Sequence, residues 1–383
     1  MQHKYDRDTA MLREPGAVQN YLLDRYRLTN AFRDSYAEYM LKNADNKKII
    51  QAAIDAINKY EGIDSACLAT HETLIGDLVY TRYVLNFKYW EYFAYGFRNI
   101  PIQRRLGFLP EGGRKAYTKI LNPSKEENLR FSDKSFLYSV LKEHFKRDAV
   151  LAHEWSEFDH FKEFVLRHPK FIVKPVRGSL GSGVYIVDVS GYTDQQMRIL
   201  FRRFLSEKNG MLCEELVSQD PRMAAAHPKS VNTVRVMTYL ALDGSVRIIC
   251  GYFRTGRGSS IVDNAGAGGM LAAVDPDSGT VMADAADEVG NMYSFHPDTG
   301  FKFKGFQIPR WDELYSIVSE CAKAFPNIRM IGWDMALSDS RGWQVIEGNC
   351  QSQLNVVQMS TREGMRAQLE RNIEWDMNRK LSK

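Results

Sequence analysis

The chain has 383 residues, of which 44% are hydrophobic and 26% are charged, and its formal net charge is +4. A chain of this length is too long to fold around one ordinary hydrophobic core, which predicts two or three domains. The small excess of positive charge argues against nucleic acid as the main ligand. No apolar run of about eighteen residues occurs, the five cysteines are scattered and the eight histidines lack zinc-binding spacing, so we expect no membrane span, no zinc site and free thiols in a reducing cytoplasm.

The first part of the chain has the pattern of helices. Apolar residues recur at spacings of three and four between residues 17 and 100, as in "KKIIQAAIDAINKY", which is typical of packed helices. The aromatic stretch at 79–97 would suit a membrane surface or a partner protein, but its interspersed charges favour a helix that is packed in the fold with one wet edge. Prolines and paired glycines then interrupt the helical pattern, which predicts a boundary near 100–125.

Helices and strands alternate after this boundary. Ser132 is expected to cap a helix that runs through "DKSFLYSVLKEHF". The patterns further along the chain predict helices at 156–167 and 194–207, a hairpin at 171–189, a strand at 210–217, several strands between 231 and 282, a helix in "WDELYSIVSECAKAF" and a last hairpin formed by "MIGWDMAL" and "WQVIEGN".

The hairpin "FIVKPVRGSLGSGVYIVDV" has a turn that is rich in glycine. Its glycines allow backbone N–H groups to approach a bulky ligand, typically a phosphate. The turn is not a P-loop, because Val184 follows Gly183 where that motif needs lysine, and no helix follows it as in a dinucleotide-binding loop. The tripeptides His-Arg-Asp and Asp-Phe-Gly of protein kinases are absent from the chain. Two alternatives remain, namely a flexible hairpin over a nucleotide with Lys174 beneath it, and an ordinary hairpin turn.

The last predicted hairpin carries two carboxylates and an amide. Glu347 and Asn349 are two residues apart on one strand and therefore point to one face, and the hairpin register could bring Asp334 beside them. This set of hard oxygen ligands suits Mg²⁺. The alternative is the polar outer face of a sheet, but the apolar neighbours of both carboxylates argue against it, because an unpaired charge in such surroundings is costly.

Two arginines are expected to face a cleft. Arg235 lies between two valines in a strand pattern, and a guanidinium on the opposite face would suit a phosphate or carboxylate through two parallel hydrogen bonds. Arg254 lies at the end of the next predicted strand, and Asn264 follows in "IVDNAGAGG". For Arg257, which lies in a glycine-rich turn, a surface salt bridge is expected.

Together these segments resemble the ATP-grasp superfamily. The resemblance lies in their order, which is a lysine in "FSDKSF", a strand lysine in "VKP", a glycine flap, an acidic strand end in "EELV", and then Asp…Glu-x-Asn. The phrases "SVNTVRVMT", "IVDNAGAGG" and "IGWDMALSDSRGWQVIEGN" look most like the sugar-transfer-associated branch. The resemblance implies an α+β fold in which two α+β subdomains clamp ATP. The resemblance covers roughly residues 100 to 360 and implies a linker and the start of the ATP-grasp region at 101–170, a lid subdomain with the flap at 171–217, and a C-terminal subdomain with the metal site at 218–383. The N-terminal helical domain at 1–100 is predicted from its helical pattern alone and has no counterpart in the resemblance.

The resemblance also implies roles for individual residues. The two lysines would bind phosphates, the flap at 178–183 would close over them, and adenine would rest at the acidic strand end. Arg235 and Arg254, with Asn264 beside them, would hold the transferring phosphoryl group or the acyl phosphate. The metal ligands would be Asp334, Glu347 and Asn349, holding one or two Mg²⁺ ions, with Mn²⁺ as a substitute. The nucleotide-binding set would comprise Lys134, Lys174, Ser179, Gly181, Ser182, Gly183, Glu214, Glu215 and Val217.

The implied reaction joins a small-molecule carboxylate to an amine at the expense of ATP, through an acyl phosphate, and the family name points to sugar, polysaccharide or natural-product modification. Two alternatives stay open. One is a kinase that phosphorylates a sugar or polyol hydroxyl, for which Asp263 is the best candidate base. The other is a catalytically silent scaffold. The sequence identifies neither the two substrates nor the oligomeric state.

Overall fold

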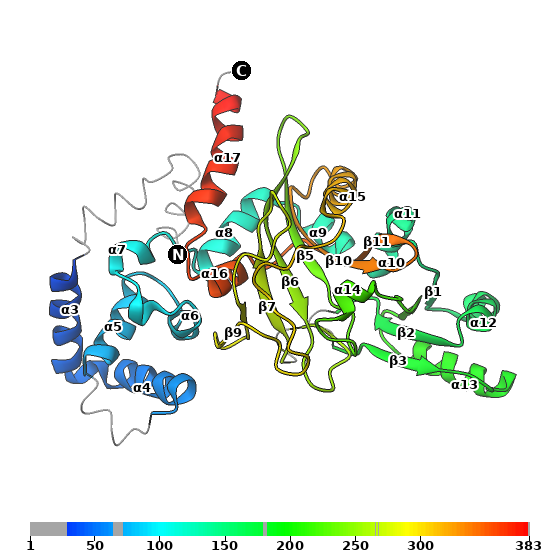
Figure 1. The fold of residues 1–383 in the computed structure, drawn as a ribbon, viewed down its shortest axis with the longest axis horizontal. Coiled ribbons are helices and arrows are strands. Elements are labelled where there is room, and N and C mark those ends of the chain that lie inside the picture. The colour runs from blue at the N-terminus through cyan, green and yellow to red at the C-terminus, as the bar shows by residue number, and fades with distance from the viewer. Residues whose placement is uncertain (1–28, 64–71, 179–181, 265, 267, 382–383) are drawn as a thin grey trace.

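The computed structural model describes residues 29–63, 72–178, 182–264, 266 and 268–381. The described residues start in a helical region, continue through two β-sheets and end in helices that return to the helical region (Figure 1). None of the helices in these ranges combines the length and the apolar character needed to cross a membrane. The helices of the first region are α3 (Asn30–Lys42), α4 (Lys47–Glu61), α5 (Glu72–Tyr83), α6 (Tyr89–Ala94), α7 (Ile102–Arg105) and α8 (Glu111–Leu121).

The aromatic stretch at 79–97 is not one helix, which corrects the prediction. Helix α5 ends at Tyr83 and α6 begins at Tyr89. Between them Asn86 adopts a φ of 64°, a left-handed conformation that an α-helix cannot contain. The backbone N–H of Lys88 then donates to Glu91 Oε2 at 2.7 Å, which fixes the start of the second helix.

The glycine pair near the expected boundary also lies inside a helix. Gly112 and Gly113 are in the first turn of α8, directly after Pro110. Glycine costs little at this position because the first N–H groups of a helix have no intrahelical acceptor in any case. A Cβ on Gly113 would lie 3.2 Å from Leu109 Cδ1, so its small size allows the helix to begin close to the preceding turn. The helical region therefore extends through the expected boundary.

The expected cap at Ser132 is displaced by one residue. Ser132 ends helix α9 (Lys125–Phe131), and Asp133 caps α10 (Lys134–Val140) by accepting hydrogen bonds from Ser135 N and Phe136 N, both at 3.1 Å. Aspartate and serine are equally favourable N-cap residues, so the residue type alone does not decide which of the two caps the helix. Helix α11 (Lys142–Phe145) follows and leads into the first sheet.

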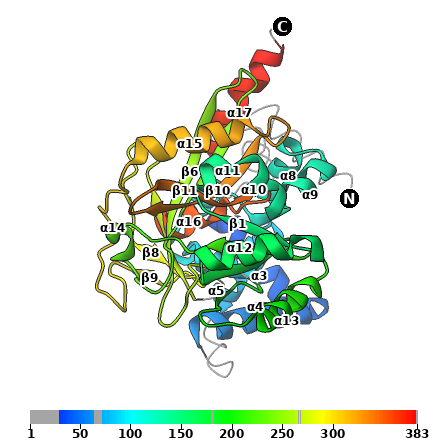
Figure 2. The ribbon, with the colours of Figure 1, turned by 90° about the vertical axis from the view of Figure 1, so that its right-hand side faces the viewer.

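The first sheet has four strands in the order β1-β4-β2-β3, with antiparallel neighbours. Two helices cover one of its faces (Figure 2). Phe161, Phe171 and Cys213 are part of the apolar core that these helices share with the sheet. Because side chains alternate along a strand, Lys174 and Glu214 belong to the opposite face. The elements are β1 (Ala149–Ala152), β2 (Lys170–Pro175), β3 (Tyr185–Asp188), β4 (Met211–Glu215), α12 (Phe158–Arg167) and α13 (Asp194–Leu205).

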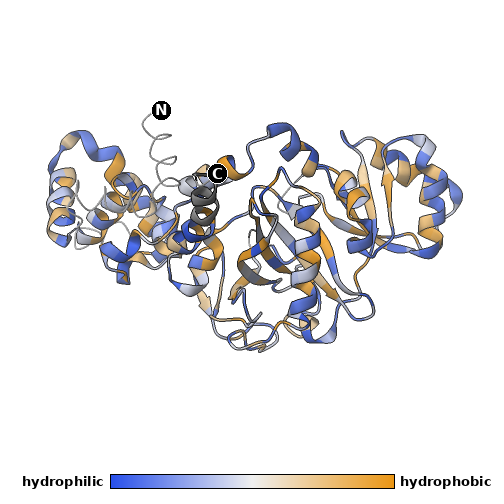
Figure 3. Ribbon diagram, turned by 90° about the horizontal axis from the view of Figure 1, so that it is seen from above, coloured by the Kyte–Doolittle hydropathy of each residue, from blue (hydrophilic) through white to orange (hydrophobic). Residues whose placement is uncertain are grey.

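The second sheet has seven strands in the order β11-β10-β5-β6-β7-β8-β9. One of its faces, which includes Val236, packs with Leu314 in a core shared with helix α15. The other face contributes Met237, Tyr252 and Leu271 to one core with the N-terminal helices and the two C-terminal helices. Hydrophobic and hydrophilic residues alternate along the outer helices, as expected when one side of each helix packs inward (Figure 3). The elements are β5 (Val234–Leu240), β6 (Val246–Thr255), β7 (Met270–Val274), β8 (Ala285–Ala286), β9 (Met292–Tyr293), β10 (Met330–Ser338), β11 (Gly342–Asn349), α14 (Pro221–Ala224), α15 (Trp311–Lys323), α16 (Asn355–Thr361) and α17 (Arg366–Leu381).

Candidate active site

The expected hairpin of β10 and β11 forms in a register that brings the predicted metal ligands together. Asp334 is the direct Cα partner of Glu347, and Gly332 is the partner of Asn349. A register shift follows immediately between Asp334 and Met335. Directly paired residues of antiparallel strands point to the same face. The two carboxylates therefore share one face of the second sheet.

Asp334 is held by two arginines from the neighbouring strands. Arg235 lies opposite it on β5 and hydrogen-bonds both carboxylate oxygens through Nε and Nη2. Arg254 at the end of β6 adds a bond from Nη1 at 2.8 Å. Burial alone would raise the pKa of Asp334, but the charges of Arg235 and Arg254 hold the pKa below its ordinary value. Arg235 thus points away from its flanking valines, as its strand pattern predicted.

The second carboxylate on Arg254 comes from the loop after β6. Asp263 Oδ1 lies 3.1 Å from Arg254 Nη2, and Asp263 Oδ2 accepts hydrogen bonds from the N–H, at 3.0 Å, and the hydroxyl of Thr233. Asn264 follows in this loop, where its backbone carbonyl accepts from Gly269 N at 3.0 Å. Both oxygens of Asp263 are therefore engaged.

Glu347 has a different environment from Asp334. Among the residues that the structure describes, its side chain forms no hydrogen bond and no ion pair. Burial raises the pKa of Glu347 above its ordinary value, although Lys134, Arg235 and Lys174 act in the opposite direction. Those three cations come from both sheets and from helix α10, so Glu347 lies where the two halves of the candidate site meet.

The candidate metal ligands are two carboxylates and one amide. No group of three or more histidine, cysteine, aspartate or glutamate side chains is arranged to hold a metal within the described ranges. The candidate ligands are Glu347, its strand partner Asp334 and the amide of Asn349. The buried Nδ2 of Asn349 lacks a hydrogen-bond partner within the described residues. The unpartnered carboxylate of Glu347 fits Mg²⁺, which takes one or two protein carboxylates and completes its shell with water and phosphate, whereas both oxygens of Asp334 are engaged by Arg235.

Lys174 on β2 is buried beside a glutamate. Its Nζ lies 2.9 Å from Glu214 Oε2, and Arg147 Nη2 lies 2.7 Å from the same oxygen. Burial alone would raise the pKa of Glu214, but Lys174 and Arg147 hold it below its ordinary value. The predicted phosphate anchor therefore sits in a buried triad with one negative and two positive charges.

Arg147 is a member of this site that sequence reasoning missed. Besides Glu214, it donates to Gln344 Oε1 at 3.2 Å and to the carbonyl of Val345 at 2.9 Å, both on β11. It thereby joins the inner face of the first sheet to the second sheet. A single arginine between a helix and a strand forms no motif, and its partners lie 67 and 197 positions away, so the sequence offered no signal for it.

Lys134 lies at the start of α10 and contacts the flap strand. Its backbone N–H donates to Val176 O at 3.1 Å, and its Nζ donates to Gly178 O at 3.0 Å. Ser179 and Gly181, two predicted flap contacts, lie outside the described residues. Ser182 and Gly183 lie in the turn before β3. Lys134 is thus placed at the base of the flap, and the phosphate-binding roles stay predictions.

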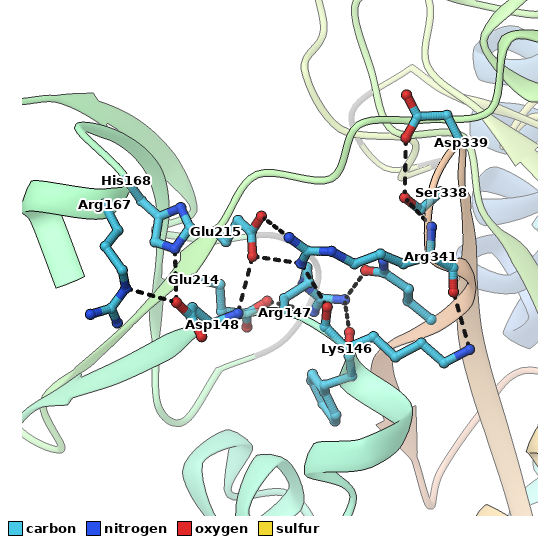
Figure 4. Close-up of polar contacts among 12 residues, drawn as sticks. Lys146, Arg147, Asp148, Arg167, His168, Glu214, Glu215, Ser338, Asp339 and Arg341 are labelled. Carbon is cyan, nitrogen blue, oxygen red and sulfur yellow. Dashed lines mark hydrogen bonds and ion pairs between the residues drawn. The ribbon is translucent and has the colours of Figure 1, made fainter.

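The paired glutamates at the end of β4 face opposite sides. Glu214 points to the inner face, whereas Glu215 receives two hydrogen bonds from Arg341, at 2.7 and 2.8 Å, and one from Asp148 N at 3.2 Å (Figure 4). Arg341 lies in the turn between β10 and β11 and also donates to the carbonyl of Lys146 at 2.7 Å. Glu215 therefore fixes the first sheet against the second, and Val217 follows in the segment that leads to the second sheet.

The turn before β3 gives a test of the flap. Gly183 has a φ of 72°, and an added Cβ would lie 2.8 Å from Pro175 Cγ. Gly191 has a φ of 80° but no atom within 4 Å of an added Cβ. We expect either alanine substitution to lower the free energy of unfolding by about 1–2 kcal/mol through backbone strain. Only Gly183→Ala should also weaken nucleotide binding, which calorimetry would measure, because only there must β2 shift. Equal effects of both variants on binding would contradict a role of this turn.

Comparisons with known proteins place these residues in a family context. A family model described as sugar-transfer associated ATP-grasp matches residues 113–374, which include every described residue of the candidate site. The comparison with curated proteins gives no match.

Three solved structures illustrate the similarity of fold. ATP-grasp ligase PsnB with minimal precursor, Mg and ADP is 12% identical, with 74% of this chain and 72% of that chain covered and a TM-score of 0.41. D-cycloserine synthetase DcsG is 11% identical, with 64% and 71% covered and a TM-score of 0.39. L-amino acid ligase from Bacillus licheniformis is 13% identical, with 69% and 54% covered and a TM-score of 0.38. These likenesses are distant, and the assignment of the family rests on the family model.

Proposed function

Because the chain belongs to the sugar-transfer-associated ATP-grasp family, we propose that it is an ATP- and Mg²⁺-dependent ligase that joins a carboxylate to an amine through an acyl phosphate. The observation that carries this proposal is the meeting of Lys134, Lys174 and Arg235 around the unpartnered Glu347, with Asp334 as its direct neighbour. Three cations and a free carboxylate at one point are suited to a nucleotide triphosphate bound with a divalent ion.

Each part of the site has a proposed role. Lys134 and Lys174 bind the phosphates, with the flap above them, and the end of β4 around Glu214 receives adenine. Glu347 and Asn349, with Asp334 beside them, would hold one or two Mg²⁺ ions or Mn²⁺. When bound, the metal supplies positive charge that neutralises the phosphate oxygens.

The reaction proceeds in two displacements. A carboxylate oxygen of the substrate attacks the γ-phosphorus of ATP, the bond to the β-phosphate oxygen breaks, and ADP leaves. The amine nitrogen then attacks the carbonyl carbon of the acyl phosphate, inorganic phosphate leaves, and the nitrogen loses a proton to give the amide. Arg235 and Arg254 hold the phosphoryl oxygens during both steps, so the protein contributes mainly positioning and charge neutralisation.

The geometry of Asp263 favours the ligase over the kinase. A general base must have an oxygen free to accept the proton of the attacking hydroxyl. Asp263 has one oxygen on Arg254 and the other on the N–H and hydroxyl of Thr233. The unpartnered Glu347 argues against a silent scaffold, since a half-buried carboxylate without a partner costs stability that a purely structural protein need not lose.

Trapping of the acyl phosphate tests this function. With ATP, Mg²⁺, a pool of carboxylates and no amine, added hydroxylamine should yield a hydroxamate, detected by mass spectrometry. Arg235→Lys should lower the yield about 10–100-fold, because a hydrogen bond to a charged group contributes about 1.5–3 kcal/mol, while ATP binding persists through the two lysines. The matched control is Arg222→Lys, since Arg222 is exposed and bonds only a local aspartate, Asp220, in the described structure.

One result would move the assignment to the kinase. This result is a stable phosphate ester on a hydroxyl compound, with no hydroxamate from any carboxylate in the pool. If the Arg235 and Arg222 variants lost hydroxamate equally, the result would instead contradict the placement of the reaction centre on the second sheet.

A further inference from the structure

Arg257 differs from the other arginines of the candidate site. Arg235 and Arg254 each form ion pairs with aspartates, whereas Arg257 forms no ion pair within the described part of the chain. The surface salt bridge expected for Arg257 is therefore wrong. Its side chain is half-buried in the loop after β6. A partly buried guanidinium without a carboxylate partner is costly unless something else binds it.

A neutral group fixes the position of this guanidinium. Arg257 Nη1 donates to the hydroxyl of Tyr293 at 3.2 Å, and the guanidinium carbon lies 5.7 Å from the centre of the Tyr293 ring. The Tyr293 hydroxyl in turn donates to Asp287 Oδ2 at 3.1 Å. Asp287 is buried and also accepts from Asn291 N at 2.9 Å. The chain of contacts orients Arg257 through a phenol and leaves its charge without a directly bound anion.

The guanidinium belongs to the same segment of the chain as the carboxylate bound to Arg254. Arg257 follows Arg254 by three residues, and an added Cβ on Gly268 would lie 3.7 Å from Arg257 Nη2. Arg257, Gly268 and Asp263, the carboxylate bound to Arg254, all belong to the segment between β6 and β7. Asp298, an acidic group beside this loop, is engaged by Gly258 N at 2.5 Å and lies 3.7 Å from His227. The surroundings of Arg257 therefore favour an anion supplied from outside the chain.

We propose that Arg257 and Tyr293 form a subsite for a second anionic group of the substrate, a carboxylate or a phosphate. The substrate then carries one carboxylate that is activated at Arg235 and Arg254, and a second anion that Arg257 binds through two parallel N–H donors. This inference rests on the proposed function, because it assigns the chemical class of the substrate of that same reaction.

Binding of small anions tests the subsite without any turnover. The full chain, saturated with ADP and Mg²⁺, is titrated in a calorimeter with three probes, namely butyrate with one carboxylate, glutarate with a second carboxylate, and 4-phosphonobutyrate with a phosphoryl group in place of the second carboxylate. We expect at least one dianion to bind about tenfold tighter than butyrate, the effect of one charged hydrogen-bond pair. The preferred dianion identifies the second group.

Two variants and a control make the result specific. Arg257→Gln should bring the affinities for dianion and butyrate to within about twofold of each other, while the affinity for butyrate stays unchanged. Tyr293→Phe, which loses the positioning hydroxyl, should reduce the preference only in part. Arg222→Gln should retain the full preference.

The inference is overturned if the wild-type chain binds no probe, if it shows no preference for a dianion, or if Arg257→Gln keeps the preference. Its failure is distinct from failure of the ligase assignment. If the chain prefers a dianion but forms no hydroxamate, the subsite is supported and the ligase assignment is refuted. If it forms a hydroxamate but shows no preference, the ligase assignment is supported and the subsite is refuted.

Discussion

Glu347→Gln is expected to reduce ATP turnover about a thousandfold while the chain stays folded. Loss of a metal ligand removes several kcal/mol of stabilisation from the phosphoryl-transfer step, and about 4 kcal/mol corresponds to a thousandfold in rate. Manganese binding, followed by electron paramagnetic resonance, should weaken in the same variant and gives a second measurement that does not depend on turnover.

The stability of this variant should also change in a defined direction. Burial raises the pKa of Glu347 in the folded chain, so its contribution to stability is complete below the ordinary pKa of glutamate and is lost as the pH rises through the folded pKa. Glutamine carries no charge at neutral pH, so the variant does not lose this stability as the pH rises. Its unfolding midpoint should therefore not fall at neutral pH. The control is Glu363→Gln at an exposed position. Full turnover or unchanged manganese affinity in Glu347→Gln would refute the metal assignment.

Arg147→Met is expected to destabilise the chain by about 3–5 kcal/mol, the usual result of removing one member of a buried ion pair. The substitution leaves Glu214 with Lys174 as its remaining cation, and it removes the donors to Gln344 and Val345 on β11. Denaturant unfolding, followed by a probe in each sheet, would measure the loss of stability and show whether the first sheet unfolds before the second.

The pH dependence gives this second prediction a signature. Because the pKa of Glu214 is lowered in the folded chain, its stabilisation is present above the ordinary pKa and is lost as the pH falls through the folded pKa. Without Arg147 the folded pKa rises, so acid should unfold the variant at a higher pH than the wild type. The triple variant Arg147→Met/Glu214→Leu/Lys174→Met, which removes all three buried charges, should recover most of the stability. A single variant within about 0.5 kcal/mol of the wild type would contradict the triad, since changes of that size are ordinary for the surface.

The sequence predicted those parts of the fold that depend on local patterns. The hairpin of β10 and β11 follows from two apolar strands joined by a short turn. The pairing of Asp334 with Glu347 does not follow from that turn, because the register of the turn would pair Asp334 with Ile346, and the register shift between Asp334 and Met335 brings Glu347 opposite it. Exceptions occurred where single residues override a pattern, as where the left-handed Asn86 interrupts a helix. The contact of Arg235 with Asp334 joins residues 99 positions apart. Only the pairing of β5 with β10 creates this contact, and no local pattern encodes it.

The shared core of the helical region has a consequence for where the chain can be divided. Tyr80, Phe97 and Leu121 belong to the same buried cluster as Met237 and Tyr252 of the second sheet, and the ring of Tyr252 lies 6.0 Å from the guanidinium of Arg235. A fragment cut at residue 113, where the family match begins, would expose this sheet face to water as a large apolar patch prone to self-association. The boundary of shared ancestry and the boundary of an autonomously soluble unit are thus different boundaries in this protein.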